Sequence, residues 1–236
     1  MSIGIVYYSD NRLDGTIIGE MSKKTILESN LPIVSCTLKP IDFGQNIVLE
    51  GRVRSHPTQT EQILIALETS TSEYVFFCEH DVLYHISHFD YIPPTDNYYY
   101  NINNWRWIYP EDLAHTYDEL TATSGLCCNR ERAIKHYKYR LELYEEWGLD
   151  KTRGREPRWA RRFGYEPGTK KKKTGGITNE DHAIRRSEFP NIDIRHAKTF
   201  TRPPIRLEQF GRPPTNWQEI TLDKIPGWNL KELFNL

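Results

Sequence analysis

Residues 74–81 read YVFFCEHD, and this stretch decides the expected fold class. Its first five residues are apolar without interruption, whereas Glu79, His80 and Asp81 are polar. An apolar run of this length favours a strand that helices cover on both faces, as in a parallel sheet, over a half-exposed antiparallel strand. The stretch therefore predicts an α/β protein in which a buried strand ends at two acids.

The residues before this stretch alternate between strand and helix patterns. Residues 3–8, IGIVYY, predict a short buried strand that ends in turn-forming residues. Apolar side chains recur at helical spacing over residues 16–29, and residues 32–38 give a second strand. Thr58 and Glu61 have the spacing of a capping box, which predicts a further helix. The chain thus opens as a β-α-β unit.

The second half of the chain is less regular, and we expect one domain over residues 1–236. The predicted elements are strands at 98–100 and 120–123, a helix from Asn129 to Gly148, a surface loop at 150–178, a short helix from Glu180 and a strand at 192–194. The proline-rich tail, residues 201–236, is expected to wrap the surface in extended form, anchored by Trp217, Trp228 and Leu233.

Composition indicates a globular protein with an uneven distribution of charge. The chain has 236 residues, 27% charged and 38% hydrophobic, and a net charge of -1. Residues 151–173 carry ten Lys or Arg against two Glu, a local charge of +8. No apolar window approaches the roughly 20 residues that span a bilayer, and the N-terminus lacks a signal-peptide pattern. Four cysteines without CxxC spacing favour a reduced compartment, so we expect a cytoplasmic protein without a membrane partner.

Polar residues follow two of the predicted strands at the point where each strand ends. Asp10 and Asn11 follow the first strand, and Glu79 and Asp81 follow the central one. In an α/β sheet such residues converge in one crevice at the carboxyl edge. Because side chains alternate along an extended segment, Glu79 and Asp81 can point the same way and offer oxygens to Mg²⁺ or Mn²⁺. The alternative is a polar strand end that only caps a neighbouring turn.

The chain resembles GT-A glycosyltransferases over about its first 200 residues. The resemblance lies in residues 3–11, in the helix and strand that follow them, in residues 74–84 and in residues 123–128. The resemblance implies a Rossmann-like, mostly parallel central sheet flanked by helices, with a nucleotide-sugar half at 1–90 and an acceptor half at 91–200. Glu79-His80-Asp81 is similar to the DxD motif that binds the metal and the diphosphate. Since Glu replaces the first Asp, Asp81 is the firmer metal ligand, and Glu79 either joins it or contacts the donor.

The same resemblance implies the other site residues. His196, which leaves the strand at 192–194, is the candidate for a late metal-binding histidine, although a structural role is the alternative. The general base of an inverting reaction would be Asp181, from the acid pair at the expected helix start, or Glu166. Two acids there could also only offset the helix dipole. The implied nucleotide-sugar contacts are Tyr8, Asp10, Asn11, Arg54, Glu79 and His80, and the implied acceptor contacts are Ser124, Gly125, Arg161, Lys170 and Lys171.

The sequence therefore predicts a metal-dependent glycosyltransferase that moves a sugar from a nucleotide diphosphate sugar, UDP-linked by preference, to a hydroxyl acceptor. The chain resembles compact phage and bacterial members, some of which modify hydroxymethylated DNA bases, and the basic segment would suit DNA. The expected location is the cytoplasm of a bacterium or of a phage-infected host. The alternatives are a non-catalytic nucleic-acid-binding α/β protein and a nucleotidyltransferase; against the latter, a Gly-rich loop after the first strand is missing. The sequence leaves the oligomeric state open.

Overall fold

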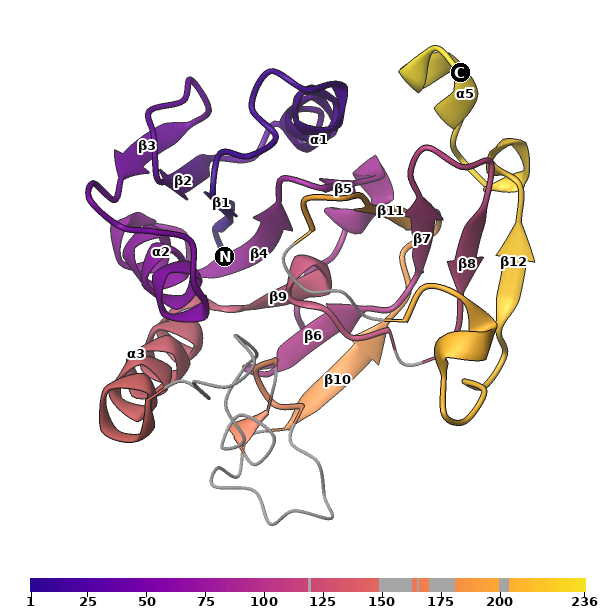
Figure 1. Ribbon diagram of the computed structural model, residues 1–236. Helices are drawn as coiled ribbons and strands as arrows, with labels where there is room; N and C mark the ends of the chain where they lie inside the picture. Colours follow the sequence, from indigo (N-terminus) through magenta and orange to yellow (C-terminus); the bar gives the residue numbers. More distant parts are fainter. Residues whose placement is uncertain (119, 149–162, 165, 170–180, 200–203) are drawn as a thin grey trace.

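Two β-sheets lie side by side, with the helices packed mainly around the larger one (Figure 1). The computed structural model describes residues 1–118, 120–148, 163–164, 166–169, 181–199 and 204–236. None of the helices in these ranges combines the length and hydrophobicity that a membrane-spanning helix requires.

The larger sheet has seven strands, of which only β9 runs antiparallel to its neighbours. In order across the sheet the strands are β10 (His182–Arg185), β6 (Tyr98–Asn101), β9 (Leu126–Asn129), β4 (Tyr74–Glu79), β1 (Ile3–Ser9), β2 (Ile33–Thr37) and β3 (Gln45–Val48). The predicted α/β class, with a mostly parallel central sheet, is therefore confirmed. Strand β4, the stretch that decided this prediction, lies at the centre beside β1.

The smaller sheet has five strands, and β7 and β11 are its parallel pair. The order is β12 (Gln218–Ile220), β8 (Ala114–Thr116), β7 (Asn104–Ile108), β11 (Asn191–Arg195) and β5 (Val82–Leu83). Because β5 follows β4 almost at once and pairs with β11, the second sheet is brought to the carboxyl end of β4.

The three long helices cover opposite faces of the larger sheet (Figure 1). They are α1 (Ile17–Leu27), α2 (His56–Thr69) and α3 (Arg130–Trp147). Along β1, Val6 faces the cluster that α2 and α3 contribute to, whereas Ile5 faces the cluster that contains Ile26 of α1. This alternation follows from the two-residue period of a strand, and it explains why β1 and β4 are apolar throughout.

Short helical turns and one short C-terminal helix complete the chain. They are η1 (Ile86–His88), η2 (Thr123–Gly125), η4 (Leu207–Gln209), η5 (Leu222–Lys224) and α5 (Leu230–Phe234). The tail is therefore more structured than the expected extended segment, since it holds β12, η5 and α5. Buried Leu222, Leu230 and Phe234 anchor it, whereas Trp217, Trp228 and Leu233 are only half-buried.

Three other local predictions were wrong. Ser55, not Thr58, caps α2, because its side chain accepts from the backbone N–H of Thr58. No strand forms at 120–123, because residues 120–122 belong to no regular element and η2 begins at Thr123, with β9 following it. Residues 182–185 form β10 on the sheet edge, so the helix expected from Glu180 does not include them. All four cysteines are buried, and none of them forms a disulfide bond.

Candidate active site

The carboxyl ends of β1 and β4 form one wall of a pocket. The two strands are parallel and adjacent, with Tyr8 paired to Glu79 in register, so the residues that follow them emerge together. The first turns of α2 and the residue before it form the facing wall. The pocket encloses about 500 Å³, part of it open solvent, and is lined by Tyr8, Ser9, Asp10, Arg54, Ser55, Thr58, Gln59, Gln62, Glu79, His80 and Asp81. Asp10 and the 79–81 motif thus converge as the strand order predicts.

Side chains from other elements fix the turn that carries the acids. The Ser22 hydroxyl of α1 lies 3.0 Å from the Glu79 carbonyl and 2.9 Å from the Val82 carbonyl, and hydrogen bonds to both. The Glu79 N–H donates to the Tyr84 hydroxyl at 2.9 Å. On the opposite wall, the buried Gln62 amide donates to the Ser9 and Cys36 carbonyls, which ties α2 to the ends of β1 and β2. The backbone of the acidic turn is therefore held before any ligand arrives.

Glu79 is set apart from Asp81 by its surroundings. Tyr8 donates a hydrogen bond to the Glu79 carboxylate at 2.5 Å. Burial, and then the negative charge of Asp81, raise the pKa of Glu79 to about 8, although the Tyr8 hydrogen bond opposes the shift. The raised pKa favours the protonated form of Glu79, which can donate a hydrogen bond and so suits contact with a donor better than binding of a cation.

Asp81 is the acid that stays charged. Burial alone would raise its pKa, but the imidazole of His196, His80 and the guanidinium of Arg195 hold the pKa below its usual value. Nε2 of His196 lies 3.4 Å from Oδ2 of Asp81, and within the described residues this buried nitrogen has no hydrogen bond of good geometry. This placement is consistent with the prediction that His196 lies beside Asp81.

A carboxylate and an unpartnered imidazole nitrogen that face each other are a donor set that fits a divalent cation. Over the described parts of the chain, no three or more His, Cys, Asp or Glu side chains are grouped to hold a metal ion. The pair therefore fits a cation that takes its remaining ligands from water and substrate phosphates, as Mg²⁺ commonly does.

A buried row of charges lies behind this pair. Arg195, next to His196, contacts the carboxylate of Asp193, and Nε of Arg106 lies 3.6 Å from the same carboxylate. Asp193 and Arg106 occupy matching positions on the neighbouring strands β11 and β7. Burial alone would lower the pKa of Arg195, but Asp193, Asp81 and Glu79 together raise it. Arg195 therefore brings a permanent positive charge to the acidic side of the pocket.

Asp193→Ala should lower the free energy of unfolding by about 3–5 kcal/mol, because it leaves two buried guanidinium groups without their shared carboxylate. Urea denaturation measures this loss. Asp223→Ala is the matched control, since that carboxylate is 56% exposed and lies 3.8 Å from Lys231. A loss no larger than that of the control would contradict the structural role of Asp193.

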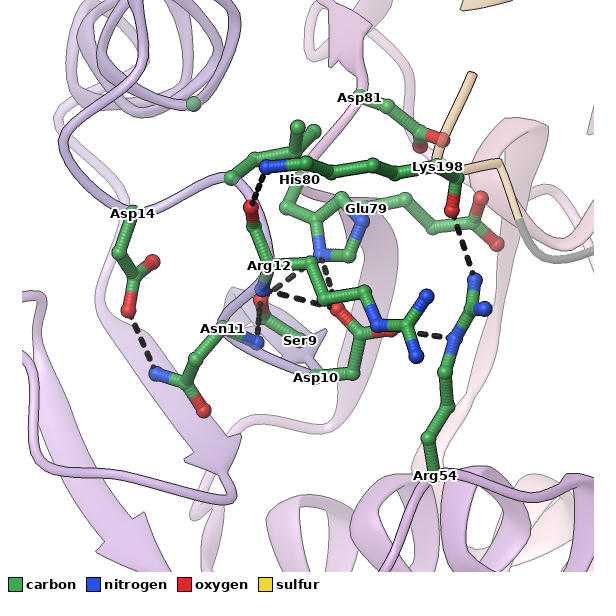
Figure 2. A network of polar contacts seen from close by, with 12 residues as sticks. Ser9, Asp10, Asn11, Arg12, Asp14, Arg54, Glu79, His80, Asp81 and Lys198 are labelled. Atoms are coloured by element: carbon green, nitrogen blue, oxygen red, sulfur yellow. Dashed lines mark hydrogen bonds and ion pairs between the residues drawn. The ribbon is translucent and has the colours of Figure 1, made fainter. Parts of the chain in front are cut away.

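Charged residues from three segments meet at the rim of the pocket, as Figure 2 shows. Nε of Arg54 lies 2.5 Å from the Asp10 carboxylate, and Arg54 also donates to the Lys198 carbonyl at 3.0 Å. Nζ of Lys198 donates to the Arg12 carbonyl at 3.1 Å. The loop after β1, the segment before α2 and the segment after β11 are thereby joined.

Two of the expected donor contacts have local partners. Nδ1 of His80 lies 2.7 Å from the Ser9 hydroxyl, which places the ring against the end of β1. Asn11 adopts a left-handed conformation with φ of 62°, and its amide oxygen accepts from the backbone N–H groups of Leu38 and Lys39. Asn11 does not line the pocket, so the structure gives it a role in holding the loop.

The two candidate bases occupy different environments. The Thr123 hydroxyl donates to the carboxylate of Glu166, next to the buried Ser124 and to Gly125 in η2. Burial, and next the charge of Glu166, raise the pKa of Tyr137, which shares a core cluster with Tyr8. Glu166 therefore approaches the core on which the pocket is built.

Asp181, by contrast, has an 86% exposed side chain that accepts from the adjacent His182 N–H. It precedes a strand rather than a helix, so a helix-start role does not apply. The acceptor residues Arg161, Lys170 and Lys171, and most of the basic segment, lie outside the described residues. Their roles stay predictions.

Sequence reasoning missed several residues of the site. The polar residues of α2 that line the pocket, Ser55, Thr58, Gln59 and Gln62, carry no motif, and Arg12 and Lys198 are single cations in turns. The one available signal was Gln62, a polar residue amid the apolar positions of a predicted helix. A buried amide at such a position requires hydrogen-bond partners.

No family model and no curated protein sequence matches the chain. Among solved structures it is similar to a glycosyltransferase involved in the glycosylation of the major capsid of PBCV-1, at 10% identity and a TM-score of 0.43, over 79% of this chain and 82% of that one. It is also similar to S. aureus TarS 1-349, at 10% identity and a TM-score of 0.33, over 57% of this chain and 49% of that one. A third similar structure is the apo form of the glycosyltransferase GlyE of Streptococcus pneumoniae TIGR4, at 12% identity and a TM-score of 0.39, over 62% of this chain and 39% of that one. At these scores the likenesses do not bear on function, which has to be inferred from the residues of the pocket.

Proposed function

We propose that this chain is a GT-A-type glycosyltransferase that moves a sugar from a nucleotide diphosphate sugar to a hydroxyl acceptor with the help of a divalent cation. The observation that carries the proposal is the meeting of Asp81 and His196 at the edge of a pocket that Asp10, Arg54 and Glu79 also line. A nucleotide diphosphate is polyanionic, and this edge combines cationic side chains with a charged acid and an imidazole.

Asp81 and His196 would hold Mn²⁺ or Mg²⁺, which when bound supplies positive charge to the diphosphate leaving group. Glu79, whose raised pKa favours the protonated form, would donate a hydrogen bond to the donor, and Tyr8 keeps its carboxyl oriented. Arg195 adds fixed positive charge beside these acids. This division of roles is a way to stabilise developing negative charge with groups already in place.

The acceptor hydroxyl needs a base, and Glu166 is the better supported of the two candidates. Its carboxyl is partly buried and oriented by Thr123, whereas Asp181 is almost fully exposed. A base on the acceptor would fit an inverting reaction. The basic segment that suggested DNA lies largely outside the described residues, so the proposal names a hydroxyl acceptor and no narrower class.

A panel of nucleotide sugars tests the proposal by thermal unfolding and calorimetric titration, with and without Mn²⁺. At least one donor, UDP-linked by expectation, should raise the melting temperature more with Mn²⁺ than with a chelator, because a ligand that binds only the folded state stabilises it. His196→Ala should weaken Mn²⁺-dependent donor binding at least tenfold.

His85→Ala is the matched control, since that histidine packs against Phe189 and Trp228 and does not line the pocket. The proposal fails if no nucleotide sugar stabilises the wild-type protein with either Mn²⁺ or Mg²⁺.

A further inference from the structure

Three basic residues from segments far apart in the chain are joined by hydrogen bonds beside the pocket. Arg12 belongs to the loop after β1, Arg54 precedes α2 and Lys198 follows β11 (Figure 2). Asp10 contacts both arginines, since its carboxylate lies 2.5 Å from Nε of Arg54 and 3.8 Å from Nε of Arg12. The charge of Asp81 also acts on Arg54.

Asp10 is held in a defined position rather than left free in solvent. Its side chain is only 10% exposed, and one oxygen accepts from the Arg12 backbone N–H at 3.1 Å. Asp10 therefore places a fixed negative charge at the centre of the cationic rim, where it holds Arg54 toward the pocket.

Two contacts of these basic residues are with uncharged groups. Arg54 and Lys198 each donate to a neutral main-chain carbonyl, at 3.0 and 3.1 Å. Within the described residues, no carboxylate lies within 4.0 Å of Lys198 Nζ. A phosphate oxygen carries a negative charge that a main-chain carbonyl lacks, so it attracts a guanidinium or ammonium group more strongly, and the planar guanidinium can bind two such oxygens at once. A phosphate would therefore be preferred over the present partners.

We propose that Arg54 exchanges Asp10 for a diphosphate, and that Arg12 and Lys198 complete a cationic clamp around this group. Asp10 acts as an internal substitute for the anion, which holds Arg54 in place while the pocket is free. Because Lys198 and Arg54 also join the segment after β11 to the pocket, the clamp positions His196 when the diphosphate binds. The inference rests on the proposed function, since it assumes that a diphosphate enters this pocket.

Calorimetric titration of inorganic pyrophosphate in the presence of a chelator isolates this clamp from the base, the sugar and the metal. Arg54→Gln should weaken pyrophosphate binding about tenfold, the loss expected for one charge-assisted contact. Asp10→Asn should strengthen it about tenfold, because the asparagine no longer competes for Arg54. In the Arg54→Gln background the same Asp10 substitution should change the affinity by no more than about twofold.

Arg52→Gln is the matched control, because Arg52 belongs to the same loop but pairs with Glu61 outside the pocket, and it should leave pyrophosphate binding unchanged. Arg54→Lys keeps the charge but lacks the planar fork, so it should fall between the wild type and Arg54→Gln. Thermal unfolding of every variant establishes that it is folded.

The exchange would be overturned if Asp10→Asn changed the affinity for pyrophosphate equally in the wild type and in the Arg54→Gln variant. It would also be overturned if Asp10→Asn alone weakened pyrophosphate binding. Failure of the wild type to bind pyrophosphate at about 10 mM, a concentration that detects even millimolar affinity, would also overturn it. In that case Mn²⁺-dependent stabilisation by a nucleotide sugar would still support the proposed function, so the two can fail separately.

Discussion

Asp81→Asn should lower the rate of sugar transfer about 10³-fold, equivalent to about 4 kcal/mol of transition-state stabilisation. The substitution keeps the shape of the side chain but removes the charge that His196, His80 and Arg195 hold in the ionised form. Binding of Mn²⁺ in the presence of a nucleotide diphosphate should weaken in parallel. Initial rates with a nucleotide-sugar donor at saturating Mn²⁺ measure the first effect, and calorimetry measures the second.

Glu79→Gln is the informative comparison, because burial raises the pKa of Glu79 and so favours its protonated form. An amide can replace a protonated carboxyl as a hydrogen-bond donor, so we expect a loss of only about tenfold. If Glu79→Gln were as damaging as Asp81→Asn, both acids would be acting as charged ligands, and the separation of roles derived from burial would be wrong.

The sequence predicts correctly the elements whose own residues carry a clear pattern, such as apolar side chains on both faces of a strand or capping residues at the ends of a helix. Strands β1 and β4 are apolar on both faces, which only a position between helices satisfies, and Asn129 and Gly148 mark the ends of α3. By contrast, β3 begins with the polar pair Gln45 and Asn46 and lies on the sheet edge, where no buried face imposes a pattern. The sequence therefore gives no signal that would predict β3.

The region before β10 shows how a local signal can mislead. Acids before an apolar pair suggested a helix start, but residues 182–185 pair with β6 along the sheet edge. That pairing joins segments far apart in the chain, and tertiary contacts override weak local propensity.

The acids of the site were predictable, whereas their electrostatic differences were not. The strand order alone places Asp10 near Glu79 and Asp81, because parallel strands end at one edge. The high pKa of Glu79 depends on its burial and on the Tyr8 hydrogen bond that the register of β1 and β4 sets. Arg12 and Lys198 likewise acquire a role only through the meeting of the loop after β1 with the segment after β11. Such properties belong to long-range packing, which no local pattern specifies.

Glu166→Gln should lower the turnover number about 10³-fold, within the range that a general base contributes, and leave donor binding unchanged. The Thr123 hydroxyl orients this carboxyl beside η2, and a glutamine there can still accept that hydrogen bond but cannot take a proton from the acceptor. Asp181→Asn should cost less than tenfold, because an 86% exposed carboxylate is neither oriented nor desolvated. Measured turnover numbers and donor dissociation constants for the two variants decide between the candidates. A large loss for Asp181→Asn with a small one for Glu166→Gln would instead assign the base to Asp181, and would require the segment before β10 to approach the pocket when the acceptor binds.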